Sequence, residues 1–175
     1  MEIIQVTKEN SDEVLAGLVD VLVDCVNRGE GISISFWPPL DRARAEKWWR
    51  DKLADAAEGR RIILAAREDG RVAGTVQVEL MGVDNQPHRA DLQKMLVHGD
   101  FRRRGLATAL MTSIEAACRA LGRTVLVLDT LRDSPAEKLY LQLGWQEVGE
   151  IPKYVRGPNG EYASTVFFYK HLAEE

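Results

Sequence analysis

Apolar residues recur along this chain at two spacings, one typical of helices and the other of strands. Steps of three and four residues predict helices after Asn10, after Asp41, and over about residues 105–121 and 134–143. Alternating or continuous apolar runs predict strands at residues 3–6, 62–67, 72–80, 90–98, 125–128, 145–149 and 165–169. The order β-α-α-β-β-β-α-β-α-β-β predicts one α/β domain over residues 1–175 with a mixed sheet.

Turn and capping residues set several of these boundaries. Asn10, followed three residues later by Glu13, matches the capping box at the start of a helix. The pair Asp69-Gly70 predicts a tight hairpin between the second and third strands. Residues 32–40 are apolar but contain Pro38-Pro39, so we predict a loop there.

Composition excludes several classes of protein. Of the 175 residues, 45% are hydrophobic and 29% charged, a mix typical of a folded globular domain. The net charge of −4 argues against general nucleic-acid binding. We find no apolar stretch of membrane-spanning length and no signal peptide, so we expect a cytoplasmic protein that does not bind membranes. Cys25 and Cys118 lie on apolar helical stripes and should be reduced and buried. No metal site is expected, and His98 should face solvent.

Three consecutive arginines stand between a predicted strand and the predicted helix that begins at Gly105. These are Arg102, Arg103 and Arg104. Cations at a helix N-terminus are unfavourable by about 0.3–1 kcal/mol each, unless an anion binds to the free N–H groups there. Gly105 and the small Ala107 would let the backbone approach a bulky ligand. A phosphate or pyrophosphate is the predicted ligand, and a solvated turn with carboxylate partners is an equal alternative.

The pattern Arg102-x-x-Gly105-x-Ala107 resembles the coenzyme A loop of the GNAT superfamily of N-acetyltransferases. The resemblance implies a central mixed, mostly antiparallel seven-stranded sheet flanked by about four helices, with acetyl-CoA as cosubstrate. From about residue 33 onward, several segments are also similar to acetyltransferases of the tabtoxin-resistance type: Asp41, Asp91-x-Gln93-Lys94, Leu128-Asp129-Thr130, Gly149-Glu150-Ile151-Pro152-x-Tyr154 and Pro158-Asn159-Gly160. The residues implied in coenzyme binding are Met95, Leu96, Val97, Arg102, Arg103, Arg104, Gly105, Leu106, Ala107 and Thr108.

Acetyl transfer to an amine requires a proton acceptor for the amine and a donor to the departing thiolate. The resemblance implies that Tyr140 is the general acid. Asp91 begins the fourth strand and Asp129 follows the fifth, so either could bind the substrate ammonium or accept its proton. Structural roles remain alternatives for all three residues. In relatives, loops like the one containing Phe36 and Trp37 border the acceptor site, and we expect these two to bind substrate.

The leading hypothesis is therefore an acetyl-CoA-dependent N-acetyltransferase for a small-molecule amine, such as an antibiotic or toxin of the tabtoxin type. Direct attack in a ternary complex is the expected mechanism. The expected partners are that amine and, in a homodimer, a second copy of the chain. Alternatives are an enzyme that acetylates a protein N-terminus or lysine, a non-catalytic acyl-CoA-binding regulator and, least favoured, a small RNA-binding module.

Overall fold

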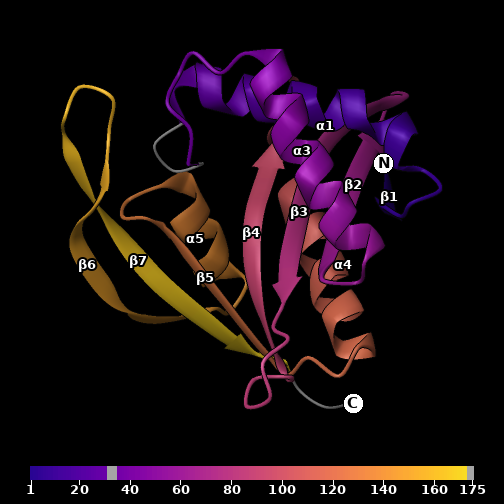
Figure 1. Cartoon of the computed structure of the whole chain (residues 1–175). Helices are drawn as coiled ribbons and strands as arrows, with labels where there is room; N and C mark the ends of the chain where they lie inside the picture. Colours follow the sequence, from indigo (N-terminus) through magenta and orange to yellow (C-terminus); the bar gives the residue numbers. More distant parts are fainter. Residues whose placement is uncertain (31–34, 173–175) are drawn as a thin grey trace.

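Seven strands form one sheet in the computed structural model, which describes residues 1–30 and 35–172 (Figure 1). Residues 31–34, which include the start of the predicted loop at 32–40, lie outside the described residues. The sheet order is β1-β2-β3-β4-β5-β7-β6, and every neighbouring pair is antiparallel except β4 with β5. The strands are β1 (Glu2–Gln5), β2 (Arg61–Glu68), β3 (Arg71–Leu80), β4 (Arg89–Val97), β5 (Val125–Leu131), β6 (Gln146–Arg156) and β7 (Tyr162–His171). The predicted mixed, mostly antiparallel sheet is confirmed.

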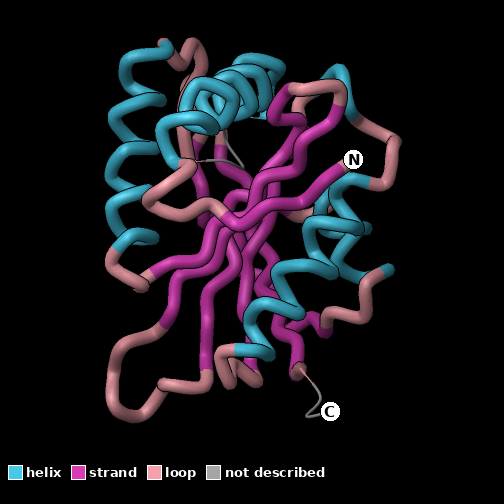
Figure 2. Tube along the Cα trace, turned by 90° about the vertical axis from the view of Figure 1, so that its right-hand side faces the viewer, coloured by secondary structure: helices cyan, strands magenta, loops and turns pink. Residues whose placement is uncertain are grey.

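Helices cover both faces of this sheet (Figure 2). Helices α1 (Ser11–Cys25) and α3 (Arg42–Ala57) lie on one face, whereas α4 (Leu106–Ala120) and α5 (Pro135–Gln142) lie on the other. Successive residues of β2 therefore enter different cores: Ile63 packs under α1 and α3, and Ile62 and Leu64 pack under α4. Burial on both faces explains the uninterrupted apolar run of residues 62–66 in β2.

Strands β4 and β5 are joined over a short stretch and then diverge (Figure 1). Their register runs only from Arg89 opposite Val125 to Asp91 opposite Val127. Farther along β4, the register with β3 shifts, and Lys94 adopts a left-handed backbone with φ of 51°. This geometry is a β-bulge, which bends a strand and redirects its side chains. The bulge and the divergence together open the sheet between β4 and β5.

The start of α1 differs from its predicted form. The side chain of Asn10 turns back, so that its Oδ1 accepts a hydrogen bond from the Thr7 N–H (2.8 Å) and its Nδ2 donates to the Gln5 carbonyl (3.0 Å). Glu13 is 2.7 Å from Arg67 on β2. The predicted capping box is therefore wrong, because both of its side chains have partners before the helix or on the sheet.

Strands β6 and β7 are longer than predicted and extend as a hairpin beyond the body of the sheet (Figure 1). Pro152 lies within β6, where it is tolerated because β6 is the edge strand. The register with β7 shifts between Ile151 and Val155. Trp37 holds the hairpin to the segment before α3, because its Nε1 donates a hydrogen bond to the Arg156 carbonyl (3.0 Å).

Three further features concern membrane-spanning helices, metal ligands and the cysteines. None of the helices within 1–30 and 35–172 has the length and apolar character to cross a membrane. In the same ranges, no three side chains of His, Cys, Asp or Glu gather as metal ligands would. Cys25 and Cys118 are both buried, and neither forms a disulfide.

Candidate active site

A cavity of about 590 Å³ occupies the gap where β4 and β5 diverge. Its wall comes from β4, the loop before α4, the first turn of α4, the end of β5 and α5. Every predicted coenzyme residue except Arg104 contributes to this wall, together with Asp129 and Tyr140. The topology therefore brings one arginine-glycine loop, one carboxylate and one phenol to a single site.

The first turn of α4 can bind an anion. The helix begins after Gly105, whose φ is 81° and which supplies no side chain to cap the turn. A Cβ at Gly105 would meet no atom within 4 Å, so the backbone here is open to the cavity. Two residues earlier, Arg103 also has a positive φ of 61°. Free N–H groups at a helix start bind phosphate, so this turn fits the diphosphate of a coenzyme.

The three arginines of this loop have different positions. Arg102 and Arg103 contribute to the cavity wall, and the Nε of Arg102 donates to the Val97 carbonyl at 3.2 Å. Arg104 lies outside the wall, and its guanidinium is 3.3 Å from the Glu68 carboxylate. The coenzyme role predicted for Arg104 thus has no support from its position. The sequence allowed two interpretations of this loop, an anion-binding site and a turn with carboxylate partners. The second describes Arg104.

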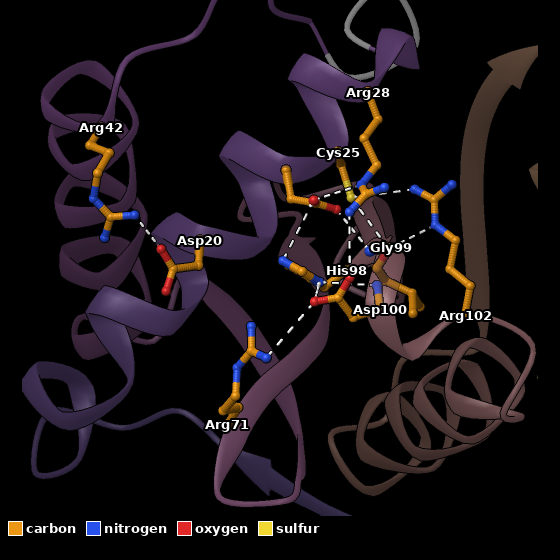
Figure 3. A network of polar contacts seen from close by, with 11 residues as sticks. Asp20, Cys25, Arg28, Arg42, Arg71, His98, Gly99, Asp100 and Arg102 are labelled. Atoms are coloured by element: carbon orange, nitrogen blue, oxygen red, sulfur yellow. Dashed lines mark hydrogen bonds and ion pairs between the residues drawn. The ribbon is translucent and has the colours of Figure 1, made fainter.

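A polar network ties the loop to the C-terminal end of α1. The carboxylate of Asp24 accepts hydrogen bonds from the Gly99 N–H (2.8 Å) and from Nε of Arg28 (2.6 Å), and His98 Nε2 lies 3.6 Å away (Figure 3). His98 Nδ1 in turn accepts from the Asp100 N–H (3.2 Å). Burial raises the pKa of Asp24, but the Gly99 and Arg28 hydrogen bonds outweigh it, and the net shift is downward. The expectation that His98 faces solvent is wrong, because its ring is buried in this network.

Tyr140 and Asp129 meet at the cavity from α5 and β5. The buried Tyr140 ring packs against Trp145 and Phe168, with ring centroids 5.9 and 6.3 Å away. Burial, and then the charge of Asp129, raise the pKa of Tyr140, so its hydroxyl stays protonated. Burial also raises the pKa of Asp129, and the nearby Lys94 opposes that rise. The cavity thus presents a hydrogen-bond donor beside a carboxylate of increased basicity.

Asp91 lies at the closed end of the gap, outside the cavity wall. It is opposite Val127 in the last pair that joins β4 to β5, and its carboxylate is 3.3 Å from Nε of Arg89. Burial raises the pKa of Asp91, while Arg89 opposes the rise. Asp129, not Asp91, is therefore the carboxylate that the cavity presents.

Phe36 and Trp37, the aromatic residues predicted at the acceptor site, do not line this cavity. Phe36 is buried and packs edge-to-face on Trp48, with ring centroids 5.8 Å apart. Trp37 is half exposed and points to the β6–β7 hairpin through its hydrogen bond to Arg156. Their role in substrate binding remains a prediction that the described cavity does not support.

Lys94 is a cavity residue that the sequence reasoning missed. It lies at the β4 bulge, where its Nζ donates to the Ser35 hydroxyl (3.2 Å) and lies 5.8 Å from the Trp48 ring. Burial lowers the pKa of Lys94, and Asp129 opposes that shift. The signal in the sequence was the pair Gln93-Lys94, two adjacent polar residues that break the alternation of apolar and polar residues along the strand.

The arginine-glycine loop at the open end of the split sheet fits a phosphate-bearing ligand, and comparisons with known proteins define the class. Residues 28–145 match the Acetyltransferase (GNAT) family. An N-acetyltransferase of the hisH-hisA intergenic region of Azospirillum brasilense is 34% identical over 130 residues, which cover 71% of this chain and 74% of that protein.

Solved structures share the fold at low sequence identity. The structure of yncA from Salmonella typhimurium with its cofactor acetyl-CoA has a TM-score of 0.75 and 18% identity, covering 100% of this chain and 95% of that one. A ribosomal-protein-alanine N-acetyltransferase from Brucella melitensis has a TM-score of 0.76 and 19% identity, covering 98% of this chain and 100% of that one.

The chain belongs to the GNAT family of acetyltransferases. It is an N-acetyltransferase, and acetyl-CoA is its cosubstrate. The open backbone at Gly105 and the uncapped first turn of α4 fit that coenzyme.

Proposed function

We propose that this protein transfers the acetyl group of acetyl-CoA to the amine of a small molecule by direct attack in a ternary complex. The observation that carries the proposal is the position of Asp129 and Tyr140 in the wall of the same cavity as the coenzyme loop. Acetyl-CoA supplies the acetyl group as a thioester. Arg102, Arg103 and the first-turn N–H groups of α4 bind its phosphates, and Arg104 holds the loop through Glu68.

Asp129 binds the acceptor ammonium and accepts its proton. A base works best when its pKa approaches the working pH, and burial shifts the pKa of Asp129 in that direction. The amine nitrogen then attacks the carbonyl carbon, the C–N bond forms and the C–S bond breaks. Asp91 has Arg89 as its charge partner and lies outside the cavity wall, so Asp129 is the better candidate for both roles.

Tyr140 donates a hydrogen bond to the departing sulfur. A thiol has an ordinary pKa of about 8.5, whereas that of a phenol is about 10 and that of Tyr140 is raised further. Complete proton transfer from the phenol to the thiolate is therefore uphill. The hydroxyl contributes mainly by stabilising the developing negative charge, which is a transition-state effect.

The finer parts of the proposal come from the sequence. By similarity, the proposed acceptor is an antibiotic or toxin of the tabtoxin type, so the proposed biological role is resistance to that compound. The proposed location is the cytoplasm, where two free cysteines would stay reduced. A homodimer is the proposed assembly. Exposed apolar residues of the edge strand β6, Val148 and Ile151, support it, and light scattering tests it.

The test is release of coenzyme thiol from acetyl-CoA across amines, amino acids, aminoglycosides, tabtoxin-like lactams and short peptides. We expect turnover with a small-molecule amine. Turnover with peptides alone would favour the second candidate, an enzyme that acetylates protein N-termini or lysines. Tight coenzyme binding with no turnover of any acceptor would contradict the proposal and favour an acyl-CoA-binding regulator.

A further inference from the structure

Two side chains of opposite charge face the cavity from the two strands that diverge around it. Lys94 comes from the bulge of β4 and Asp129 from the end of β5. The left-handed backbone at Lys94 is unfavourable for a residue with a side chain by about 1–2 kcal/mol. Strained backbone of this kind is commonly retained where it positions a functional group.

The ammonium of Lys94 has neutral neighbours. Nζ donates to the Ser35 hydroxyl and lies against the Trp48 ring, and in the described part of the chain it has no carboxylate within 4 Å. Arg61 and Lys52 are the other cations whose charges act on it, and Asp129 is the anion that does so. A partly desolvated cation without a close counter-ion can gain much from a ligand that brings a carboxylate.

Asp129 is in the complementary situation. Its carboxylate forms no ion pair with any side chain in residues 1–30 and 35–172, although it is close enough to Lys94 to affect that residue's pKa. A ligand that carries an ammonium and a carboxylate on neighbouring carbons would supply a counter-ion to both side chains at once. A simple amine would supply a counter-ion to Asp129 only.

We propose that Lys94 and Asp129 together select a zwitterionic acceptor, an amino acid or amino-acid analogue, with Lys94 holding its carboxylate and Asp129 its amine. This inference rests on the proposed function and narrows its substrate class. Polycationic amines are disfavoured because Lys94 repels a second positive charge. Peptide N-termini are disfavoured because their first residue has no free carboxylate.

The reaction follows directly from this arrangement. The acceptor ammonium gives one proton to Asp129, and the free amine attacks the thioester carbonyl. The C–N bond forms as the C–S bond breaks, the nitrogen loses its second proton, and the sulfur takes one. The products are an N-acetyl amino acid and the coenzyme thiol, with one proton released to solvent.

The experiment compares each L-amino acid with its own carboxamide, which keeps the side chain and the amine but lacks the carboxylate. Lys94→Met removes the cation, Lys94→Arg keeps it, and Lys52→Met is the matched control. Lys52 also lies 5.8 Å from the Trp48 ring, but it pairs with Asp55 and lies outside the cavity wall. Coenzyme affinity, measured by calorimetry, serves as the folding control for every variant.

We expect the wild-type enzyme to turn over at least one acid far better than its carboxamide. Lys94→Met should raise the acceptor KM by on the order of ten- to a hundredfold, because it removes a charge-assisted hydrogen bond made in ground and transition states alike. The acid-to-carboxamide preference should fall towards one in Lys94→Met and persist in Lys94→Arg and Lys52→Met.

Two results would overturn this inference, and they differ in what they say about the proposed function. Turnover of amines or carboxamides as good as that of acids would reject the zwitterion and keep the acetyl transfer to small molecules. The absence of turnover with every class of small molecule, despite coenzyme binding, would reject both. An unchanged acid preference in a folded Lys94→Met enzyme would also overturn the role of Lys94.

Discussion

Burial shifts the pKa values of Asp129 and Tyr140 in the same direction, with opposite chemical consequences. A carboxylate with a raised pKa is a stronger base, and it remains ionised near neutral pH only if the rise is moderate. Lys94 limits that rise for Asp129. A phenol with a raised pKa is a weaker acid, and it remains a hydrogen-bond donor throughout the physiological range. The wall of one cavity thus holds an acceptor of protons and a donor of hydrogen bonds.

Asp129→Asn should remove the acidic limb of the pH–rate profile. In the wild type, activity should fall as the pH drops through the pKa of Asp129, which lies above the ordinary value of about 3.9. The variant cannot accept a proton, so we expect kcat/KM to fall by about 100- to 10,000-fold with no such limb. Asp84→Asn, in the exposed loop after β3, is the control. A wild-type profile in Asp129→Asn would assign the base elsewhere.

Tyr140→Phe should lower kcat with little effect on coenzyme affinity, because the hydroxyl acts where negative charge develops on sulfur. We expect a loss of about 100-fold or more at saturating substrates. Tyr169→Phe removes a hydroxyl that bonds Gln146 outside the cavity wall, and it should keep the wild-type rate. If both variants have the same kcat as the wild type, Tyr140 serves packing alone.

At the scale of elements, the start of α4 decides coenzyme binding. Gly105→Val adds branched carbon atoms to the face that is open to the cavity and strains a φ of 81°. Gly122, just after the same helix, has a φ of 68° and equally open surroundings, so Gly122→Val carries similar strain away from the cavity. Calorimetry with acetyl-CoA should show a loss of on the order of tenfold or more for Gly105→Val. Equal affinity in the two variants would contradict the loop assignment.

Local sequence signals predicted the elements whose causes are local. Asp41 caps α3 through the Arg44 N–H (2.9 Å), and Asp69-Gly70 forms the predicted hairpin with both φ values positive. The arginine-glycine turn likewise depends on adjacent residues. Every residue predicted to bind the coenzyme, except Arg104, lies in the cavity wall, and their binding role stays a prediction. The sequence did not predict the full lengths of β6 and β7. Exposed polar residues and Pro152 interrupt the apolar pattern by which a strand is recognised.

Features that depend on distant partners could not be predicted in this way. His98 is buried because Asp24, 74 residues earlier in the chain, lies beside it on α1. Lys94 reaches the cavity because the β3 register places a bulge there. Arg104 lies outside the cavity wall because its guanidinium pairs with Glu68 at the end of β2. Each outcome is set by tertiary contacts, which a single sequence does not display.

At the scale of the whole molecule, Asp24 couples α1 to the β4–α4 loop, and this coupling should depend on pH. The folded pKa of Asp24 is lowered, so its stabilising effect is present above the ordinary carboxyl pKa of about 3.9 and is lost as the pH falls through the folded value. We expect Asp24→Asn to lower the free energy of unfolding by about 1–3 kcal/mol at neutral pH. The difference from wild type should shrink below about pH 4.

Denaturant titrations at several pH values measure this difference, with Asp20→Asn as the control. Asp20 lies on the same helix and pairs with Arg42, but both side chains are exposed (Figure 3). Such a surface pair contributes about 0–1 kcal/mol. Equal destabilisation by the two substitutions would show that the Asp24 network does not hold the loop more firmly than an ordinary surface pair.

The gap between β4 and β5 also links the stability of the fold to the bound coenzyme. Beyond Asp91, main-chain groups on the facing edges of both strands have no partner strand among residues 1–30 and 35–172. Their amide protons should exchange quickly with deuterated water. Acetyl-CoA bound along that edge should slow the exchange, and at a hundredfold excess over its Kd it should stabilise the fold by about 2.7 kcal/mol. Since proteases in a cell act on the unfolded fraction, the abundance of this enzyme would rise and fall with the supply of its own acetyl donor.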